Sequence, residues 1–314
     1  MVFPKDLSLG HLFLIYINDL HLTIYNSITH HFADDTNLVC FGKSLKSLNN
    51  KINNDLRYLT RWLRANKISL HAGKTEYVLF NSHKPPDHDF IVRLGGRRLT
   101  PSHHIKYLGM LIDRNLNFGP QINAVAIELK KANGILARLR YTVPKDVLIS
   151  VYYALFYSHL NYCIQIWGQN VSTNTSRLQA LQNSAVRIMS FADYHAPVDP
   201  LYFDLKIIKY EDLLHIHNAT FIHSIYHNLL PVSLIDMFAI DFSHAYPTRA
   251  SARGLINSYA KRTTSFGIKS IRNQCILSWN HCHKLLPDNV TLYDLTASKL
   301  KSTLKAFFLN SYVH

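Results

Sequence analysis

Apolar positions recur at spacings of three and four residues in two long stretches, a pattern that predicts two amphipathic helices. The first begins after Ser44, a residue type favoured at helix N-caps. Its apolar positions are Leu45, Leu48, Ile52, Leu56, Leu59 and Leu63. The second begins at Pro120, with apolar positions at Ile122, Val125, Leu129, Ala132, Leu136 and Leu139. Because Lys130, Lys131, Arg138 and Arg140 lie between them, we expect this helix to have a basic side.

Short apolar runs between turn residues predict strands around these helices. Residues 27–41 have the form of a β-hairpin with Asp34 and Asp35 at its tip. Further strands are expected at 68–80, 90–98 and 105–112, and the Gly95-Gly96 pair suits a tight turn. These segments and the two helices together predict an α+β fold.

Two other apolar stretches predict buried structure. Residues 9–20 end in Asn18 and Asp19, which favour chain reversal, so we expect a buried helix or strand there. Residues 147–167 are apolar but interrupted by polar side chains, which favours a buried helix or helix pair over a membrane span. From residue 147 onward the pattern is mostly helical, and residues near 165–177 have the composition of a loop.

The distribution of charge indicates a polyanionic partner. The 314 residues carry a net charge of +14, with His counted as neutral. Residues 61–145 hold 15 basic and 5 acidic side chains, whereas residues 1–60 hold 5 of each. Nucleic acid is the first candidate and an anionic membrane surface the second. The four cysteines are too scattered for a disulfide framework, and the first thirty residues lack a secretory pattern, so an intracellular location is expected.

Two groups of residues could carry chemistry. Adjacent carboxylates at a rigid hairpin tip, Asp34 and Asp35, could bind divalent cations together, although two solvated turn residues would give the same pattern. A set of soft ligands, Cys275, His281, Cys282 and His283, has a spacing that fits no zinc knuckle. Cysteines of this kind are more often small buried hydrophobic residues.

The carboxylate pair lies in a longer string of matches to one family. HFADDTNLV (31–39), preceded by LFLIYINDL (12–20), resembles the catalytic motif region of reverse transcriptases of non-LTR retrotransposons, the jockey-like and related elements. The similarity continues in order through NNKINNDLRYLTRWLRANKISL, HAGKTEYVLF, IKYLGMLID, YYALFYSHLNYCIQIWG and RLQALQNSAVRIM. It covers at least residues 9–190.

The resemblance implies a right-hand polymerase fold that is only partly present. Residues 1–117 would be a partial palm without fingers, 118–168 a helical thumb or connection, and 169–314 a helical C-terminal region of unknown role. Asp34 and Asp35 would be palm carboxylates that bind Mg²⁺ for nucleotidyl transfer with two ions. Lys74 matches a family lysine near the incoming triphosphate, or is an ordinary exposed lysine.

Two further sets of residues would contact nucleic acid. Tyr107, Leu108 and Gly109 match the hairpin that supports the primer end, although the first two could simply be strand core. The helix that carries Lys130 and Lys131 would contact duplex phosphates without reading sequence, unless this is a solvated face. The implied partners are an RNA template, a DNA primer and dNTPs. The expected location is the nucleus or the cytoplasm, and no membrane association is expected; the oligomeric state stays open.

Departures from the family pattern predict a truncated copy. The family's third carboxylate, on a strand upstream of the hairpin, has no counterpart, and Lys5 and Asp6 stand where a Gln-Gly pair is usual. We therefore expect an N-terminally truncated chain with an accidental Met1 and no polymerase activity by itself. The alternatives are a catalytically dead remnant that still binds nucleic acid and a remnant that does not fold.

Overall fold

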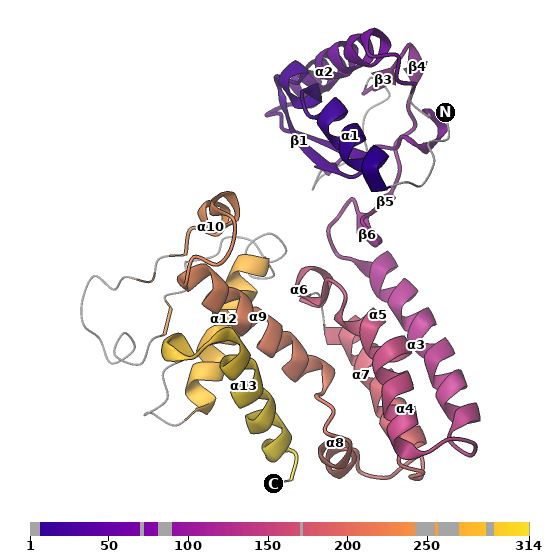
Figure 1. The fold of residues 1–314 in the computed structure, drawn as a ribbon, viewed down its shortest axis with the longest axis vertical. Coiled ribbons are helices and arrows are strands. Elements are labelled where there is room, and N and C mark those ends of the chain that lie inside the picture. Colours follow the sequence, from indigo (N-terminus) through magenta and orange to yellow (C-terminus); the bar gives the residue numbers. More distant parts are fainter. Residues whose placement is uncertain are drawn as a thin grey trace. The chain divides into compact units, whose positions relative to one another are not determined.

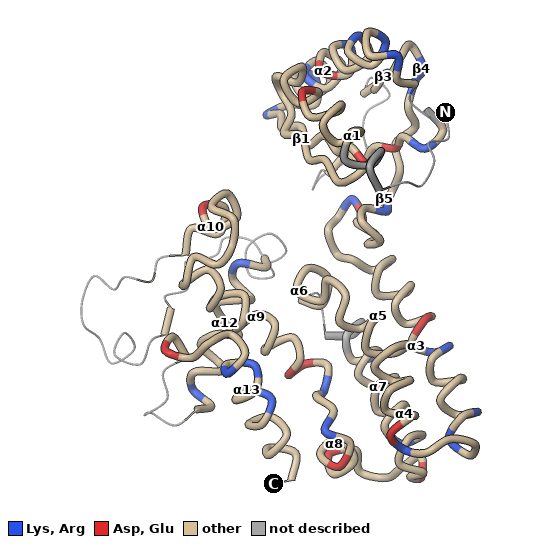
Figure 2. The backbone as a smooth tube through the Cα atoms, in the orientation of Figure 1, with Lys and Arg blue, Asp and Glu red and all other residues tan. Residues whose placement is uncertain are grey.

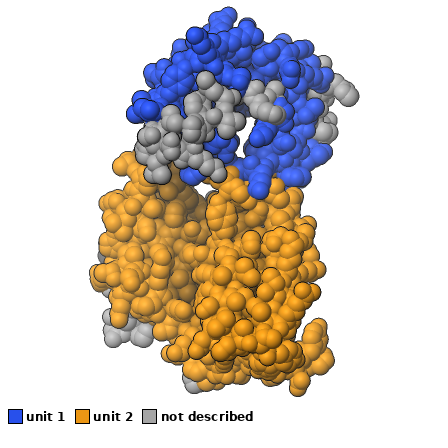
Figure 3. Space-filling view, turned by 45° about the vertical axis from the view of Figure 1, so that its right-hand side comes forward, with its two compact units in different colours: residues 1–107, 113–115 blue, residues 108–112, 116–314 orange. Residues whose placement is uncertain are grey.

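The chain folds into two compact units, each with its own hydrophobic core (Figures 1 and 3). The structure, a computed structural model, describes residues 7–69, 72–80, 90–169, 172–240, 242, 255–256, 270–286 and 292–313. Unit 1 comprises residues 1–107 and 113–115, and unit 2 comprises residues 108–112 and 116–314. The chain thus passes between the units three times within ten residues, 107–116.

The described part of unit 1 contains one long helix, three short helical segments and three small hairpins, of which the last continues into unit 2. Its helical elements are α1 (Leu7–Ile17), η1 (Leu20–Thr23), α2 (Leu45–Ala65) and η2 (Ala72–Lys74). Its strands are β1 (Ser27–Phe32), β2 (Asp35–Cys40), β3 (Arg93–Leu94), β4 (Arg97–Arg98) and β5 (His104–Tyr107), and β5 pairs with β6 (Met110–Asp113).

The long helix α2 organises unit 1 as its apolar pattern predicts. Ser44 caps its N-terminus by accepting a hydrogen bond from the backbone N–H of Ser47, at 3.2 Å. Leu56, Leu59 and Leu63 are buried on one face. The core that they join contains Leu20, Ile24, Leu79, Phe90, Val92, Leu94 and Leu99. The amphipathic helix, its cap and the Gly95-Gly96 turn between β3 and β4 are confirmed.

Two sequence predictions for unit 1 are wrong. Over the described part of 68–80 the chain forms the short helical turn η2 and a single bridge between Tyr77 and Pro101, not a strand. The segment 9–20 is helical as allowed, but it is not buried: Leu12 is 60% exposed and Ile15 72% exposed. Among its described side chains, from Leu12 onward, the buried ones are Ile17 and Leu20 at the end of the segment.

Unit 2 is helical. After β6 its elements are α3 (Gly119–Leu139), α4 (Lys145–Val151), the π-helical segment η3 (Tyr152–Tyr157), α5 (Ser158–Asn161), α6 (Ile164–Trp167), α7 (Ser172–Met189), α8 (Asp199–Leu205), α9 (Tyr210–Tyr226), α10 (Val232–Phe238), α12 (Ile271–Leu285), η5 (Leu292–Asp294) and α13 (Ala297–Ser311). No described helix combines the length and apolar character needed to cross a bilayer.

One hydrophobic core runs through unit 2. Helix α3 packs on α7, and α9 packs on α12 and α13. Trp167 and Trp279 are the largest fully buried side chains. The predicted helix after Pro120 and the buried apolar run at 147–167 are both confirmed. Residues on both sides of the expected boundary at 168 belong to this unit, whereas the expected boundary at 117 lies beside the division between the units. The palm and thumb assignment itself stays a prediction.

Candidate active site

The hairpin β1–β2 presents the two candidate carboxylates at its tip. The strands are antiparallel with Phe32 opposite Asp35, so Ala33 and Asp34 form a two-residue turn. Ala33 has a φ of 52°, the left-handed conformation that such turns require and that few residues other than glycine adopt. Asp34 lies in the turn, Asp35 is the first residue of β2, and both are exposed. The predicted hairpin and the position of both carboxylates are confirmed.

A buried carboxylate in α2 holds the base of this hairpin. Asp55 is fully buried, and its oxygens accept hydrogen bonds from the backbone N–H of Tyr25 at 3.3 Å and of Asn26 at 3.1 Å. The Asn26 side-chain amide donates to it at 2.9 Å and the Ser27 hydroxyl at 2.6 Å. Sequence reasoning missed this residue. A signal was present, because a carboxylate beside Leu56 in an apolar stripe needs buried partners.

The two faces of the hairpin differ in what they contact. Thr29, His31 and Leu38 lie on the face that is partly buried. The opposite face exposes Ile28 and Phe32, which is 61% exposed. Phe32 does not pack beneath the turn, because alternation along β1 places its ring on the open face. The hairpin therefore offers an uncovered apolar face next to its carboxylates.

A neutral histidine lies near the tip on the covered face. His31 Nδ1 is 3.2 Å from the Thr36 hydroxyl oxygen. Partial burial, together with the nearby positive charges of His21 and His30, lowers the pKa of His31. The lowered pKa favours the uncharged imidazole, which does not compete with a cation for the neighbouring carboxylates.

The tip fits part of a magnesium site. Carboxylate oxygens are the ligands that Mg²⁺ prefers, but its octahedral shell needs six oxygens, which water and substrate phosphates usually complete. Asp34 and Asp35 make no ion pair with any described side chain. Within the described ranges no group of three or more His, Cys, Asp or Glu side chains converges on a cation position. Lys74, at the exposed end of η2, does not pair with either carboxylate.

The segment expected to support a primer end is a tight turn. Tyr107 ends β5, and Leu108 and Gly109 connect it to β6 with φ values of 45° and 81°. Positive φ is costly for a leucine. The hydroxyl of Tyr162 donates to the backbone carbonyl of Leu108 and holds the turn. The predicted hairpin is confirmed, and its contact with a primer stays a prediction.

The basic residues predicted for nucleic-acid contact lie on the exposed side of α3, in unit 2. Figure 2 shows basic positions along this helix. Lys130 and Lys131 are both exposed, but Lys131 pairs with Glu128 at 2.7 Å. This hydrogen bond lowers the pKa of the Glu128 carboxyl. Lys131 is thus partly neutralised within the helix.

The second candidate group does not form a metal site. Cys275 and Cys282 are fully buried in α12, and burial raises the pKa of each thiol to about 12. Among the described residues, these cysteines do not converge with other His, Cys, Asp or Glu side chains into a group of three that could hold a metal ion. The ring of His281 lies against the ring of His215 at a tilt of 36°, with ring centroids 4.6 Å apart. Both cysteines act as small buried hydrophobic residues.

Comparison with known proteins identifies relatives of the chain. It is 26% identical over 191 residues to the RNA-directed DNA polymerase from mobile element jockey of Drosophila funebris, which covers 58% of this chain. It is 24% identical over 200 residues to the probable RNA-directed DNA polymerase from transposon BS, and 22% identical over 227 residues to that from transposon X-element, both of Drosophila melanogaster. These matches cover 60% and 69% of this chain.

The matches span only 20%, 21% and 25% of the length of those relatives. No family model and no solved structure matches the chain. The resemblance that the sequence shows from the hairpin at Phe32–Asp35 (FADD) onward is nevertheless confirmed. Over about three fifths of its length, the chain is a relative of the RNA-directed DNA polymerases of non-LTR mobile elements.

Proposed function

We propose that this chain is a fragment of a reverse transcriptase in which Asp34 and Asp35 are the metal-binding carboxylates of nucleotidyl transfer. The observation that carries the proposal is the hairpin β1–β2, which places two adjacent, unpaired and exposed carboxylates at its tip. The relatives that the chain matches are RNA-directed DNA polymerases. An RNA template, a DNA primer and dNTPs are the corresponding substrates.

Each site residue has a role in this proposal. Bound Mg²⁺ would supply charge to activate the attacking hydroxyl and stabilise the leaving oxygen. Asp34 and Asp35 hold the cation, and Asp55 fixes the hairpin that carries them. Lys74 supplies positive charge near the leaving pyrophosphate. The turn at Leu108 and Gly109 supports the primer, and Lys130 with the rest of the exposed side of α3 contacts phosphates.

We further propose that the chain does not polymerise by itself. Two carboxylates leave a divalent ion short of protein ligands, and no third described carboxylate reaches the tip. Three apolar side chains, Ile28, Phe32 and Val39, are exposed on one face of the hairpin, beside His30 and Asp35. Exposed apolar side chains on a strand face normally pack against another layer of structure. A further polymerase segment is needed both there and at the metal site.

A primer-extension assay tests the proposal. The full chain, with Mg²⁺, dNTPs and a primed RNA template, should give no product. The same chain joined after the polymerase segment that precedes the aligned region in the jockey relative should extend the primer. Asp34→Asn or Asp35→Asn in the joined protein should reduce extension by about 100-fold or more, because several kcal/mol of charge stabilisation is lost.

Asp19→Asn is the matched control, because Asp19 is an exposed carboxylate of the same unit whose side chain caps nothing. It should leave extension unchanged. An inactive joined protein, or equal losses in Asp19→Asn and Asp34→Asn, would show that the hairpin does not carry this chemistry.

The second candidate function is nucleic-acid binding without catalysis. It is favoured by the net charge of +14, which is concentrated between residues 61 and 145. Binding of this type loses affinity steeply as salt is added. Affinity for primed template that is strong at low salt, with no extension by the joined protein, would select this function.

A further inference from the structure

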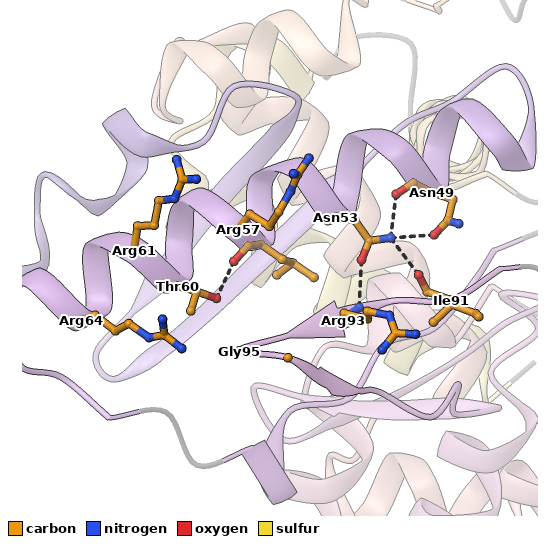
Figure 4. A pocket seen from close by; sticks show the side chains of 11 residues that line it. Asn49, Asn53, Arg57, Thr60, Arg61, Arg64, Ile91, Arg93 and Gly95 are labelled. Carbon is orange, nitrogen blue, oxygen red and sulfur yellow. Dashed lines mark hydrogen bonds between the residues drawn. The ribbon is translucent and has the colours of Figure 1, made fainter.

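A groove lined by arginines runs along α2 in unit 1. It lies between the helix and the hairpin β3–β4, and its volume is about 620 Å³. Arg57, Arg61 and Arg64 from α2 and Arg93 from β3 line it, with Leu56 among the remaining lining residues (Figure 4). We call this feature the arginine groove. No role in the proposed reaction uses it.

The three helix arginines form one row. Residues separated by three and four positions share a helix face, and Arg57, Arg61 and Arg64 are all exposed. With a rise of 1.5 Å per residue, they span about 10 Å along the axis. A nucleic-acid strand advances about 3.4 Å per nucleotide in a B-form duplex, so the row matches the length of about three nucleotides.

The charge of the row is not neutralised by any residue that the structure describes. Among the described residues, no carboxylate lies within ion-pair distance of these arginines. Arg57 donates to the side-chain oxygen of Asn54, and Arg61 lies 5.9 Å from the ring centre of Tyr58. The only acidic residue of α2 is Asp55, which is buried and occupied by the hairpin. Over the described ranges, the guanidinium groups therefore have no carboxylate partner that an external anion would have to displace.

The wall of the arginine groove is built in advance. Asn53 donates to the carbonyl of Ile91 at 2.8 Å and accepts from the backbone N–H of Arg93 at 2.9 Å, so its amide ties β3 to α2 (Figure 4). At the turn, Gly95 and Gly96 have φ values of 59° and 88°, and a Cβ at either position would meet no atom within 4 Å. The turn thus leaves the groove mouth open to a bulky ligand.

We propose that the arginine groove binds the phosphodiester backbone of a nucleic-acid strand, at an accessory site separate from the hairpin tip. Guanidinium groups bind phosphate through paired hydrogen bonds, and a row of them follows successive phosphates without reading the bases. Asp55 points toward the hairpin β1–β2. Around the helix axis it is about 160° away from Arg57, so the arginine groove lies on the opposite side of α2. The proposal rests on the proposed function only for the choice of nucleic acid as the polyanion.

A salt titration of binding tests the site. The full chain and the variant Arg57→Gln/Arg61→Gln/Arg64→Gln are titrated with a fluorescent 12-nucleotide oligouridylate at several salt concentrations. Log affinity falls with log salt, and each phosphate contact on a single strand contributes about −0.7 to this negative slope. The variant, which lacks three contacts, should therefore have a slope that is less steep by about 2. Lys299→Gln/Lys301→Gln/Lys305→Gln removes the same charge from exposed positions of α13 and should leave the slope unchanged.

Two further arms separate the explanations. Lys130→Gln/Lys131→Gln probes the phosphate contacts of the proposed function: if only this variant lowers the slope, the arginine groove is not a site while the proposed function stands. Inorganic tripolyphosphate is added as a competitor at equal phosphate concentration. If it displaces the oligonucleotide fully, the groove takes free phosphates and the nucleic-acid proposal is overturned; weak competition supports it. Unchanged circular dichroism of the arginine variant confirms that it is folded.

Discussion

Replacement of Asp55 should release the catalytic hairpin from α2 while leaving unit 2 intact. Four donors converge on this carboxylate: the backbone N–H groups of Tyr25 and Asn26, the Asn26 side-chain amide and the Ser27 hydroxyl. A hydrogen bond of this kind contributes about 1 kcal/mol net, and donors left unpaired in a buried site cost more. Because Tyr25 and Asn26 are exposed, water can replace part of what is lost.

For Asp55→Ala we expect a loss of about 3 kcal/mol in the opening free energy of the hairpin. For Asp55→Asn the expected loss is about 1–2 kcal/mol, because one acceptor oxygen remains. Native-state hydrogen exchange of peptides that cover β1 and β2 measures this quantity directly. Since 1.4 kcal/mol corresponds to a factor of ten, exchange in Asp55→Ala should accelerate about 150-fold.

Asp34→Asn provides the control, because its carboxylate is exposed and makes no ion pair with any side chain that the structure describes. It should change exchange by less than about 0.5 kcal/mol. Two results would refute the reasoning: unchanged protection of β1 and β2 in Asp55→Ala, or equal loss of protection in the helices of unit 2. In the joined polymerase, Asp55→Ala should also reduce primer extension, although the residue touches no substrate.

Three other changes have defined outcomes. Ser44→Ala removes the cap of α2 and should cost about 1 kcal/mol, seen as faster exchange in the first turn of the helix. Gly96→Ala, at a φ of 88°, should destabilise the β3–β4 turn by about 1 kcal/mol, whereas Gly134→Ala, in open space on α3, should raise the melting temperature of unit 2. Burial and the nearby charge of His281 lower the pKa of His215 from 6.5 to about 4. Between these pH values the unfolded chain binds a proton that the folded chain does not, so unit 2 should lose up to about 3 kcal/mol as pH falls from 6.5 to 4, and His215→Gln should flatten this dependence in urea titrations.

The features predicted well from sequence are those that depend on neighbouring residues. The stripe of α2, its cap at Ser44 and the Gly95-Gly96 turn all follow from local spacing and backbone preference, and each is observed. The FADD hairpin belongs to the same class, since its strands pair across two residues. Local pattern is sufficient where the contacts that stabilise an element lie within a few residues of it.

The features missed are those that depend on residues far apart in the chain. Burial of α1 could not be judged from its composition, because burial needs a partner surface and unit 1 covers only its end. The pairing of Asp55 with Asn26 joins positions 29 residues apart. From sequence alone, the row of Arg57, Arg61 and Arg64 predicts only a solvated helix face. The groove depends on Asn53, whose hydrogen bonds hold β3 beside α2. The strand expected at 68–80 fails for the same reason, since a strand needs a neighbour along its length.

The triple passage of the chain between the units limits how this protein can be divided. A fragment that stops at Tyr107 would lose residues 113–115, and with them the hydrogen bond from the Arg114 N–H to the His103 carbonyl at 3.0 Å. A fragment that stops at Asn115 would keep that bond but carry residues 108–112 away from unit 2, including the buried Met110. Neither half can therefore be exchanged as a clean cassette between related elements, and a recombination junction in this hairpin would have to bring both halves from the same parent.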